Sequence, residues 1–276
     1  MTTVAVENEA QAVLHQALEC LIKGSPNPIT GPRTASWSER SVEVPWVAGH
    51  LTDAERLLDV GYAMAPPEWM GVLLATQDRG TALTGIDIVD PQRVRTRYPA
   101  EMVEKVLATT VRVESILDAQ PSDGTFDTIT CVSTLEHIGF DIATPPETTD
   151  TAYVRAARAE DALATRDPQT DRNFLDAVAR LLAPGGSLLL SVPAGRGGAI
   201  LHQDSLGLFT YQFEYGPADW QAVTSDSRFE LALEAFFRHD EAAGWEEVGS
   251  FDQLTGQSSA MRPFATACAM ARMTLR

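Results

Sequence analysis

The fold is decided by Leu57-Leu58-Asp59-Val60-Gly61-Tyr62-Ala63 and, further along the chain, by Leu83-Thr84-Gly85-Ile86-Asp87. The first segment is a short apolar run that leads into a turn of small residues. The second is an apolar run that ends in an acid. A strand, a tight turn, a helix and a second strand with a terminal carboxylate form a nucleoside-binding βαβ unit. The sequence therefore predicts a nucleoside site at these two strand ends.

Composition limits the class of protein before any other motif is considered. The chain has 276 residues, of which 44% are hydrophobic, as expected for an α/β domain with insertions. Its formal net charge of −17 argues against nucleic acid or an anionic membrane as partner, because both would repel it. Cys20, Cys131 and Cys268 lack metal-binding spacing, and no stretch resembles a membrane helix or a signal peptide. We therefore expect a cytoplasmic protein without a metal site.

The order of expected elements is typical of one doubly wound α/β sheet. Apolar, β-branched runs predict parallel strands, and amphipathic spacing predicts the helices between them. Strands are expected at 56–61, 82–88, 110–114, 126–133 and 187–192, and an antiparallel pair at 245–251 and 264–273. Helices are expected at 9–23, from 66 to about 74, and at 99–108, 171–183, 218–224 and around 229–237.

Three segments lie outside this alternation. Residues 1–43 are expected to form an N-terminal cap of one helix and irregular chain, and residues 44–276 the main domain. Insertions at about 141–170, with a helical run at 151–165, and at about 196–217 are expected over the ligand-binding edge of the sheet. In the second insertion, the alternation of Tyr211, Phe213 and Tyr215 indicates a short strand.

The ordered set of motifs resembles class I S-adenosylmethionine-dependent methyltransferases. The matching segments are 57–61, 84–87, 126–138 and 181–193, so the resemblance covers about residues 44–195. Pro45-Trp46 and the segment from Ser133 to Gly139 are similar to a bacterial subgroup of glycan and natural-product sugar O-methyltransferases. The resemblance implies a mostly parallel, seven-stranded Rossmann-like sheet with a C-terminal antiparallel hairpin. It also implies S-adenosyl-L-methionine as the cofactor.

The same resemblance assigns residues to this cofactor. Asp59 and Gly61 would hold its amino-acid tail, and Gly61 leaves room for a close approach of the backbone. Asp87 would bind the ribose, because one carboxylate can accept both hydroxyls. Ser115 and Ile116 are expected at the edge of the adenine. The other residues expected at the cofactor are Trp46, Tyr62, Ala63, Ile88, Ser133 and Glu136. For Trp46, the alternative is a place in the core.

The chain departs from the family's pattern at two places. Ala63 and Ala65 stand where the usual turn has glycines, and alanine does not easily adopt a positive φ. Ser115 stands where an acid usually contacts the adenine amine, and either this serine or Asp118 would accept that hydrogen bond. These departures keep open a catalytically degenerate binding or scaffold protein. A nicotinamide-dependent reductase is disfavoured, because no G-x-G-x-x-G follows the first strand.

Methyl transfer to a hydroxyl needs an in-line geometry and a base. His137 follows the fourth strand, at the edge of the sheet where ligands bind, and imidazole titrates near neutral pH. His137 is therefore the first candidate for the base, with His202 and Asp141 as the alternatives. The alternative role for His137 is a contact to the cofactor or the packing of a helix cap.

Candidate contacts to the acceptor, a sugar or glycosylated small molecule, are Arg40, His202 and Tyr211. Each has another interpretation. Arg40 would otherwise cover the cofactor, His202 would lie on the surface, and Tyr211 would join an apolar cluster with Phe213 and Tyr215. The N-terminal helix could also pair subunits in a homo-oligomer.

Overall fold

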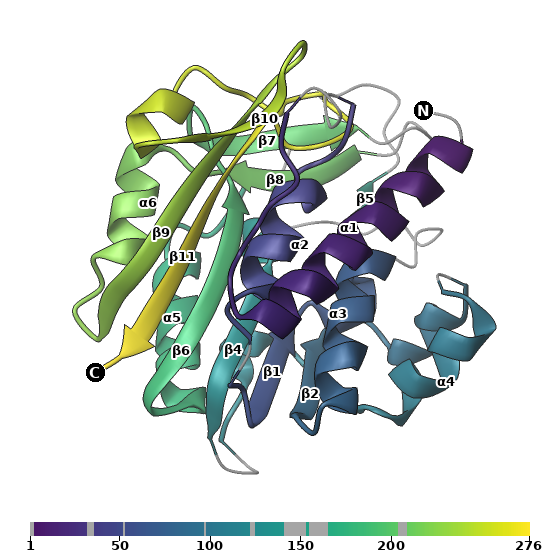
Figure 1. The fold of residues 1–276 in the computed structure, drawn as a ribbon. Helices are drawn as coiled ribbons and strands as arrows, with labels where there is room; N and C mark the ends of the chain where they lie inside the picture. The colour runs from purple at the N-terminus through teal and green to yellow at the C-terminus, as the bar shows by residue number, and fades with distance from the viewer. Residues whose placement is uncertain are drawn as a thin grey trace.

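Within residues 3–31, 36–51, 53–96, 98–121, 125–140, 153–154, 165–203 and 209–276, which the computed structural model describes, the chain forms two sheets (Figure 1). The parallel strands of the larger sheet are β1 (Arg56–Val60), β2 (Ala82–Asp87), β3 (Thr110–Val113), β4 (Phe126–Val132) and β6 (Leu182–Pro193). The antiparallel strands β9 (Phe229–Asp240), β10 (Gly244–Val248) and β11 (Ala267–Leu275) complete the order β10-β9-β11-β6-β4-β1-β2-β3. The doubly wound, mostly parallel sheet is thus confirmed.

Helices cover both faces of this sheet. On one face, α1 (Thr3–Lys23), α2 (Arg40–Ala48), α3 (Pro67–Asp78) and α4 (Ala100–Ala108) pack around Leu57 and Leu83. On the other, α5 (Thr170–Leu181) and α6 (Pro217–Thr224) pack around Leu58 and Ile129. Successive side chains of a strand point to opposite faces, so Leu57 and Leu58 of β1 belong to two different cores. Short 3₁₀ turns include η2 (Tyr62–Met64), η3 (Pro91–Thr96), η4 (Ile116–Asp118), η5 (Leu135–His137) and η7 (Phe251–Leu254).

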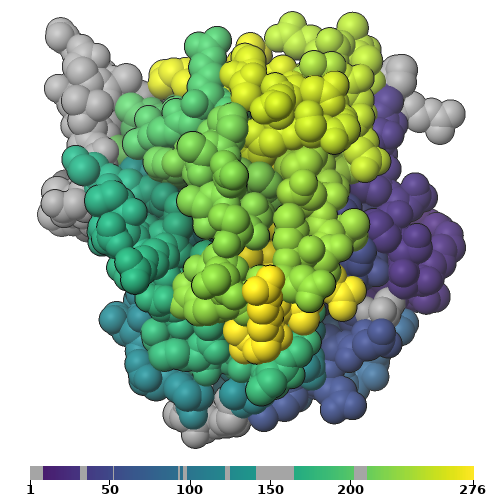
Figure 2. Space-filling view, turned by 90° about the vertical axis from the view of Figure 1, so that its left-hand side faces the viewer, coloured from purple at the N-terminus to yellow at the C-terminus, as the bar shows by residue number. Residues whose placement is uncertain are grey.

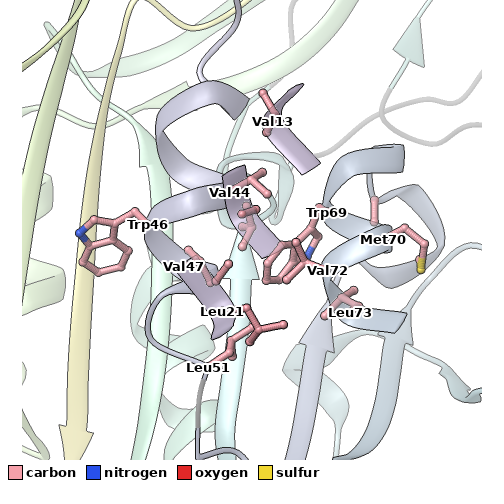
Figure 3. Packing of buried hydrophobic residues seen from close by; sticks show 14 of the residues in the cluster. Val13, Leu21, Val44, Trp46, Val47, Leu51, Trp69, Met70, Val72 and Leu73 are labelled. Atoms are coloured by element: carbon pink, nitrogen blue, oxygen red, sulfur yellow. The ribbon is translucent and has the colours of Figure 1, made fainter. Parts of the chain in front are cut away.

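Residues 40–48 form α2, although irregular chain was expected as far as residue 43. Pro45 lies inside this helix and has no N–H to donate to the carbonyl of Ser41. That carbonyl accepts the N–H of Ile29 instead (2.9 Å), so a tertiary hydrogen bond replaces the missing helical one. α2 runs across the expected boundary at 43/44, and Figure 3 shows Val13 and Leu21 of α1 in the same core as Val44.

The helix expected around 229–237 is wrong, because these residues belong to β9. Leu231, Ala232 and Leu233 have good helix propensity, but pairing with β11 from Phe229 to Arg238 overrides it. β9 therefore lies between the two closing strands, which do not form the expected hairpin with each other, and the described sheet has eight strands instead of seven. Figure 2 views this edge of the molecule, which the C-terminal part of the chain covers in green and yellow.

A second, antiparallel sheet lies at the carboxyl ends of the parallel strands (Figure 1). It consists of β5 (Tyr153–Val154), β8 (Phe209–Glu214) and β7 (Gly198–Gln203), in the order β5-β8-β7. The short strand indicated around Tyr211 is thus confirmed. Tyr153 and Val154 form a strand where a helical run was expected, and residues 141–152 and 155–164 lie outside the described residues. The aromatic and β-branched pair suits a strand better than a helix.

Candidate active site

A cavity of about 530 Å³ opens at the carboxyl ends of β1, β2, β3 and β4. This volume lies within the range of roughly 300–1,000 Å³ found for small-molecule sites. Parallel strands that end at one edge of a sheet bring distant segments of the chain together there. The predicted site residues that line the cavity are Arg40, Asp59, Gly61, Asp87, Ile88, Ser115, Ile116, Ser133 and His137.

Asp59 is a buried acid near the end of β1. Its Oδ1 accepts hydrogen bonds from Trp69 Nε1 (3.0 Å) and Thr130 Oγ1 (2.7 Å), whereas Oδ2 has no hydrogen-bond partner among the described residues. Burial raises the pKa of Asp59 to about 7, although both hydrogen bonds act to lower it. A buried acceptor in the wall of a cavity suits a ligand that brings its own donor. An ammonium group, such as that of an amino-acid tail, fits this position.

We expect binding of S-adenosylhomocysteine to release a proton from Asp59. A carboxyl with a pKa of about 7 is largely protonated at pH 6.5, and a nearby ammonium group favours its ionised form. By linkage, affinity should rise with pH and level off once Asp59 is ionised in the unliganded protein. Calorimetry at pH 6.5, in buffers with different ionisation enthalpies, measures this release. Asp59→Asn keeps the acceptor for Trp69 and Thr130, and equal release by both proteins would contradict the assignment.

Gly61 opens the turn that follows β1, with a φ of +88°. A Cβ at this position would lie 2.4 Å from Oγ1 of Thr134, so the loop after β4 also requires glycine here. Ala65 has a φ of −52°, and Ala63 is not among the described residues with positive φ. The turn therefore needs left-handed backbone only at Gly61, and both alanines that depart from the family's pattern are compatible with it.

Asp87 ends β2 and connects the two loops that border the cavity. Its Oδ2 accepts the N–H of Ala63 (2.9 Å), and its Oδ1 accepts the N–H of Val89 (2.9 Å). A carboxylate has about four lone-pair sites, so it can accept several hydrogen bonds at once. Ile88, the next residue, is 58% exposed and lines the cavity. The acid thus has an apolar surface beside it, as a nucleoside site requires.

One wall of the cavity is formed by the residues that directly follow β3. Ser115 caps η4, because its Oγ accepts the N–H of Leu117 (3.2 Å), and the buried Ile116 follows it. Asp118, the alternative acid, is not among the lining residues, but Glu114 is. Sequence reasoning did not select Glu114, since it precedes the position where the family's acid was expected. The acid beside the predicted adenine site is therefore Glu114.

Glu43 joins α2 to the ends of β4 and β6. Its Oε2 accepts hydrogen bonds from Ser133 Oγ (2.8 Å) and Ser191 Oγ (2.9 Å), and its Oε1 forms an ion pair with Arg40. Ser133 has a φ of +43°, which non-glycine residues rarely adopt, and its N–H donates to the carbonyl of Ser191 (3.2 Å). Arg40 is the one guanidinium or ammonium among the described residues of the wall. No local motif predicted Glu43.

His137 lies in η5 and lines the cavity. Its Nδ1 lies 2.7 Å from the carbonyl oxygen of Tyr211 in β8. A carbonyl only accepts hydrogen bonds, so Nδ1 carries the proton, and Nε2 is the acceptor nitrogen of the neutral imidazole. Nε2 lies 3.8 Å from Oε1 of Glu136, whose pKa burial raises to about 8. The fold thus holds His137 in the tautomer that proton uptake at Nε2 requires.

Trp46 and Tyr62 lie away from the cavity wall. In Figure 3 the Trp46 ring points away from Val44 and Trp69, and it is only 3% exposed in the core. Tyr62 packs its ring beneath Gly85, where an added Cβ would lie 2.4 Å from the ring. Both aromatic side chains fill space around the sheet, since neither is among the residues that line the cavity in the described part of the chain.

Ala63, Glu136 and Tyr211 also lie behind the wall. The N–H of Ala63 is bonded to Asp87, Glu136 is buried, and the Tyr211 ring stacks on Phe140 with centroids 5.6 Å apart. Phe140 itself lines the cavity. Asp141 lies outside the described residues, as does the side chain of His202, whose backbone belongs to β7.

The strand ends, the buried acids and the cavity define a nucleoside-binding α/β protein. A sequence model of the methyltransferase domain family matches residues 40–236, and the chain belongs to this family. Its membership supports S-adenosylmethionine as the cofactor, in agreement with the sequence prediction.

Several solved structures are similar to this chain. A methyltransferase from Methanosarcina mazei, described as S-adenosylmethionine-dependent, has 16% identity and a TM-score of 0.49, over 81% of this chain and 92% of that one. The N-methyltransferase NodS from Bradyrhizobium japonicum has 14% identity and a TM-score of 0.40, over 80% and 78%. The 1,6-didemethyltoxoflavin-N1-methyltransferase from Burkholderia thailandensis has 13% identity and a TM-score of 0.45, over 80% and 71%. No curated protein matches the chain in sequence.

Among the described residues, no helix combines the length and the apolarity needed to cross a membrane.

Proposed function

We propose that this protein transfers a methyl group to a hydroxyl of a small molecule, namely a sugar or a glycosylated natural product. When bound, S-adenosylmethionine supplies an electrophilic methyl group on a sulfonium. The observation that carries the proposal is the orientation of His137 by the carbonyl of Tyr211 (2.7 Å). A hydroxyl must lose its proton as it attacks, and Nε2 can take that proton. An amine that binds in its neutral form would need no such base, so the oriented imidazole favours oxygen as the acceptor atom.

The cavity wall supports one arrangement of the cofactor. Asp59 would accept hydrogen bonds from the ammonium group of its tail, and Asp87 would accept them from the ribose hydroxyls. Ile88 and Ile116 would lie against the adenine, with Ser115 at its polar edge. The loop after β4, which carries the proposed base, lines the same cavity, so this base would face the cofactor's reactive end across it.

The acceptor would lie between this loop and the smaller sheet, where Phe140 and Thr210 line the cavity. Arg40 offers a guanidinium to a carboxylate, either of the cofactor's tail or of an acceptor. We retain His202 as a proposed acceptor contact and Asp141 as an alternative base. Cytoplasmic location and subunit pairing also stay predictions. In this chain, Val13, Ala17 and Leu21 of α1 are buried in its own core.

The proposal is tested by incubating the full chain with S-adenosylmethionine and a panel of sugar nucleotides and glycosides. Each hydroxyl compound should be paired with the amino sugar in which an amine replaces one hydroxyl. We expect S-adenosylhomocysteine and an O-methylated product, identified by mass spectrometry and NMR. Methylation of the amino sugars alone would contradict the choice of oxygen. Failure to bind either cofactor form at about 1 mM would favour the degenerate scaffold.

A further inference from the structure

Arg166 lies near the end of the first insertion, beside the loop that carries His137. Its Nε donates to the carbonyl of Ile138 (3.0 Å), and its Nη2 donates to the carbonyl of Leu135 (3.2 Å). These carbonyls belong to the residues on either side of Glu136 and His137. Arg166 also pairs with Phe140 in an isolated antiparallel bridge. One guanidinium thus holds the backbone of η5 at both ends.

The guanidinium is itself held by α5 and β8. Nη2 lies 2.6 Å from Oδ1 of Asp171 and 3.1 Å from the hydroxyl of Tyr215, which in turn donates to Asp171 (2.8 Å). The guanidinium carbon lies 4.4 Å from the centre of the Phe213 ring. The arginine side chain is only 6% exposed. A planar group with several donors in a fixed geometry can satisfy all these partners, whereas the single ammonium of lysine cannot.

We propose that Arg166 is a positioning residue that sets the tautomer of His137. Strand β8 supplies the carbonyl of Tyr211 that accepts the hydrogen bond from Nδ1, and it also supplies Phe213, whose ring faces Arg166. Tyr215, which accepts a hydrogen bond from Arg166, directly follows this strand. Arg166 therefore fixes η5 relative to the strand that orients the imidazole. This inference rests on the proposed role of His137 as base, and it adds the group that keeps this base oriented.

The consequence of losing Arg166 follows from these contacts. The carbonyl of Ile138 loses the Arg166 donor, and that of Leu135 keeps the N–H of Ile138 (3.1 Å). η5 thus loses the side chain that ties its backbone to Asp171 of α5 and to Phe213 of β8. The hydrogen bond from Nδ1 to Tyr211 then no longer fixes the ring, and the proton is free to move to Nε2. An imidazole that carries its proton on Nε2 cannot accept one there. Cofactor binding should change little, because Arg166 is not among the described residues that line the cavity.

The test is the tautomer of His137 in the full chain, read from ¹⁵N–¹H NMR spectra of histidine-labelled protein at about pH 8, where histidine is mostly neutral. His137→Asn identifies the His137 signals. We expect wild type to show the proton on Nδ1, Arg166→Lys to lose this single pattern, and Tyr215→Phe to weaken it. The affinity for S-adenosylhomocysteine should stay within about threefold, which is under 1 kcal/mol.

Arg228→Lys is the matched control. Arg228 also forms an ion pair with an acid of α5, Asp176, but does not contact η5. The wild-type pattern in both Arg166→Lys and Tyr215→Phe would overturn the inference. Should Arg166→Lys not fold, Tyr215→Phe, which removes only a hydroxyl, decides the question alone. A proton on Nε2 in wild type would instead contradict the proposed base itself.

Discussion

Replacing His137 with asparagine should lower the rate of methyl transfer by about 10²–10⁴-fold, which is the range for loss of a general acid–base group. Asparagine can still donate an N–H to the carbonyl of Tyr211 from a position close to that of Nδ1, but it has no nitrogen that accepts a proton. The variant therefore removes the base while preserving the contact that orients it. The rate is measured under saturating S-adenosylmethionine, with the acceptor identified in the panel.

The affinity of the asparagine variant for S-adenosylhomocysteine should stay within about threefold of wild type. His15→Asn is the matched control, because the His15 side chain is 77% exposed on α1. An unchanged rate in His137→Asn would remove His137 from the mechanism. A loss confined to cofactor affinity would show that His137 contacts the cofactor instead.

Replacing Asp87 with asparagine should weaken the binding of S-adenosylhomocysteine by about 10²–10³-fold. Hydrogen bonds to a charged group contribute roughly 1.5–3 kcal/mol each, and the proposed site has two of them to the ribose. The amide would also turn a donor towards the N–H of Ala63 or of Val89, both of which donate to the carboxylate at 2.9 Å. The loss therefore combines a missing charge with a disturbed turn, and calorimetry measures it directly.

Asp90→Asn is the control for this variant. Asp90 lies in the same loop and accepts the N–H of Gln92 (2.8 Å), but it does not line the described cavity wall. Its affinity should equal that of wild type. A thermal melt of each variant separates loss of the site from loss of the fold. A folded Asp87→Asn protein that binds as tightly as wild type would exclude Asp87 as the ribose contact.

The sequence predicted the central strands because each is a local pattern. The runs around Leu57, Ile86 and Ile129 are apolar, β-branched in part and bounded by turns, and such strands are recognisable when both faces are buried. β9 was missed because its residues have helix propensity and only the distant β11 makes them a strand. α2 was partly missed because a proline such as Pro45 usually ends a helix. Only the folded chain brings the N–H of Ile29 to the carbonyl of Ser41, which Pro45 leaves without its helical donor.

The residues of the candidate site also differ in how far the sequence could predict them. Asp59, Gly61 and Asp87 were predicted, because strand ends and turns fix their positions locally. Trp69 and Thr130, which hold the Asp59 carboxylate, were not. Neither was Glu43 or Arg166, whose partners lie on elements that only the folded chain brings together. Asp59, Gly61 and Asp87 were therefore predictable from local motifs, whereas the residues that hold these positions in the fold were not.

The proposed cofactor site is tested by a crystal structure of the full chain with S-adenosylhomocysteine. We expect the ribose hydroxyls within hydrogen-bonding distance of the Asp87 carboxylate, the amino group of the tail at Oδ2 of Asp59, and the adenine between Ile88 and Ile116. Binding at another surface, with the cavity at the ends of β1 and β2 filled by protein side chains, would contradict it.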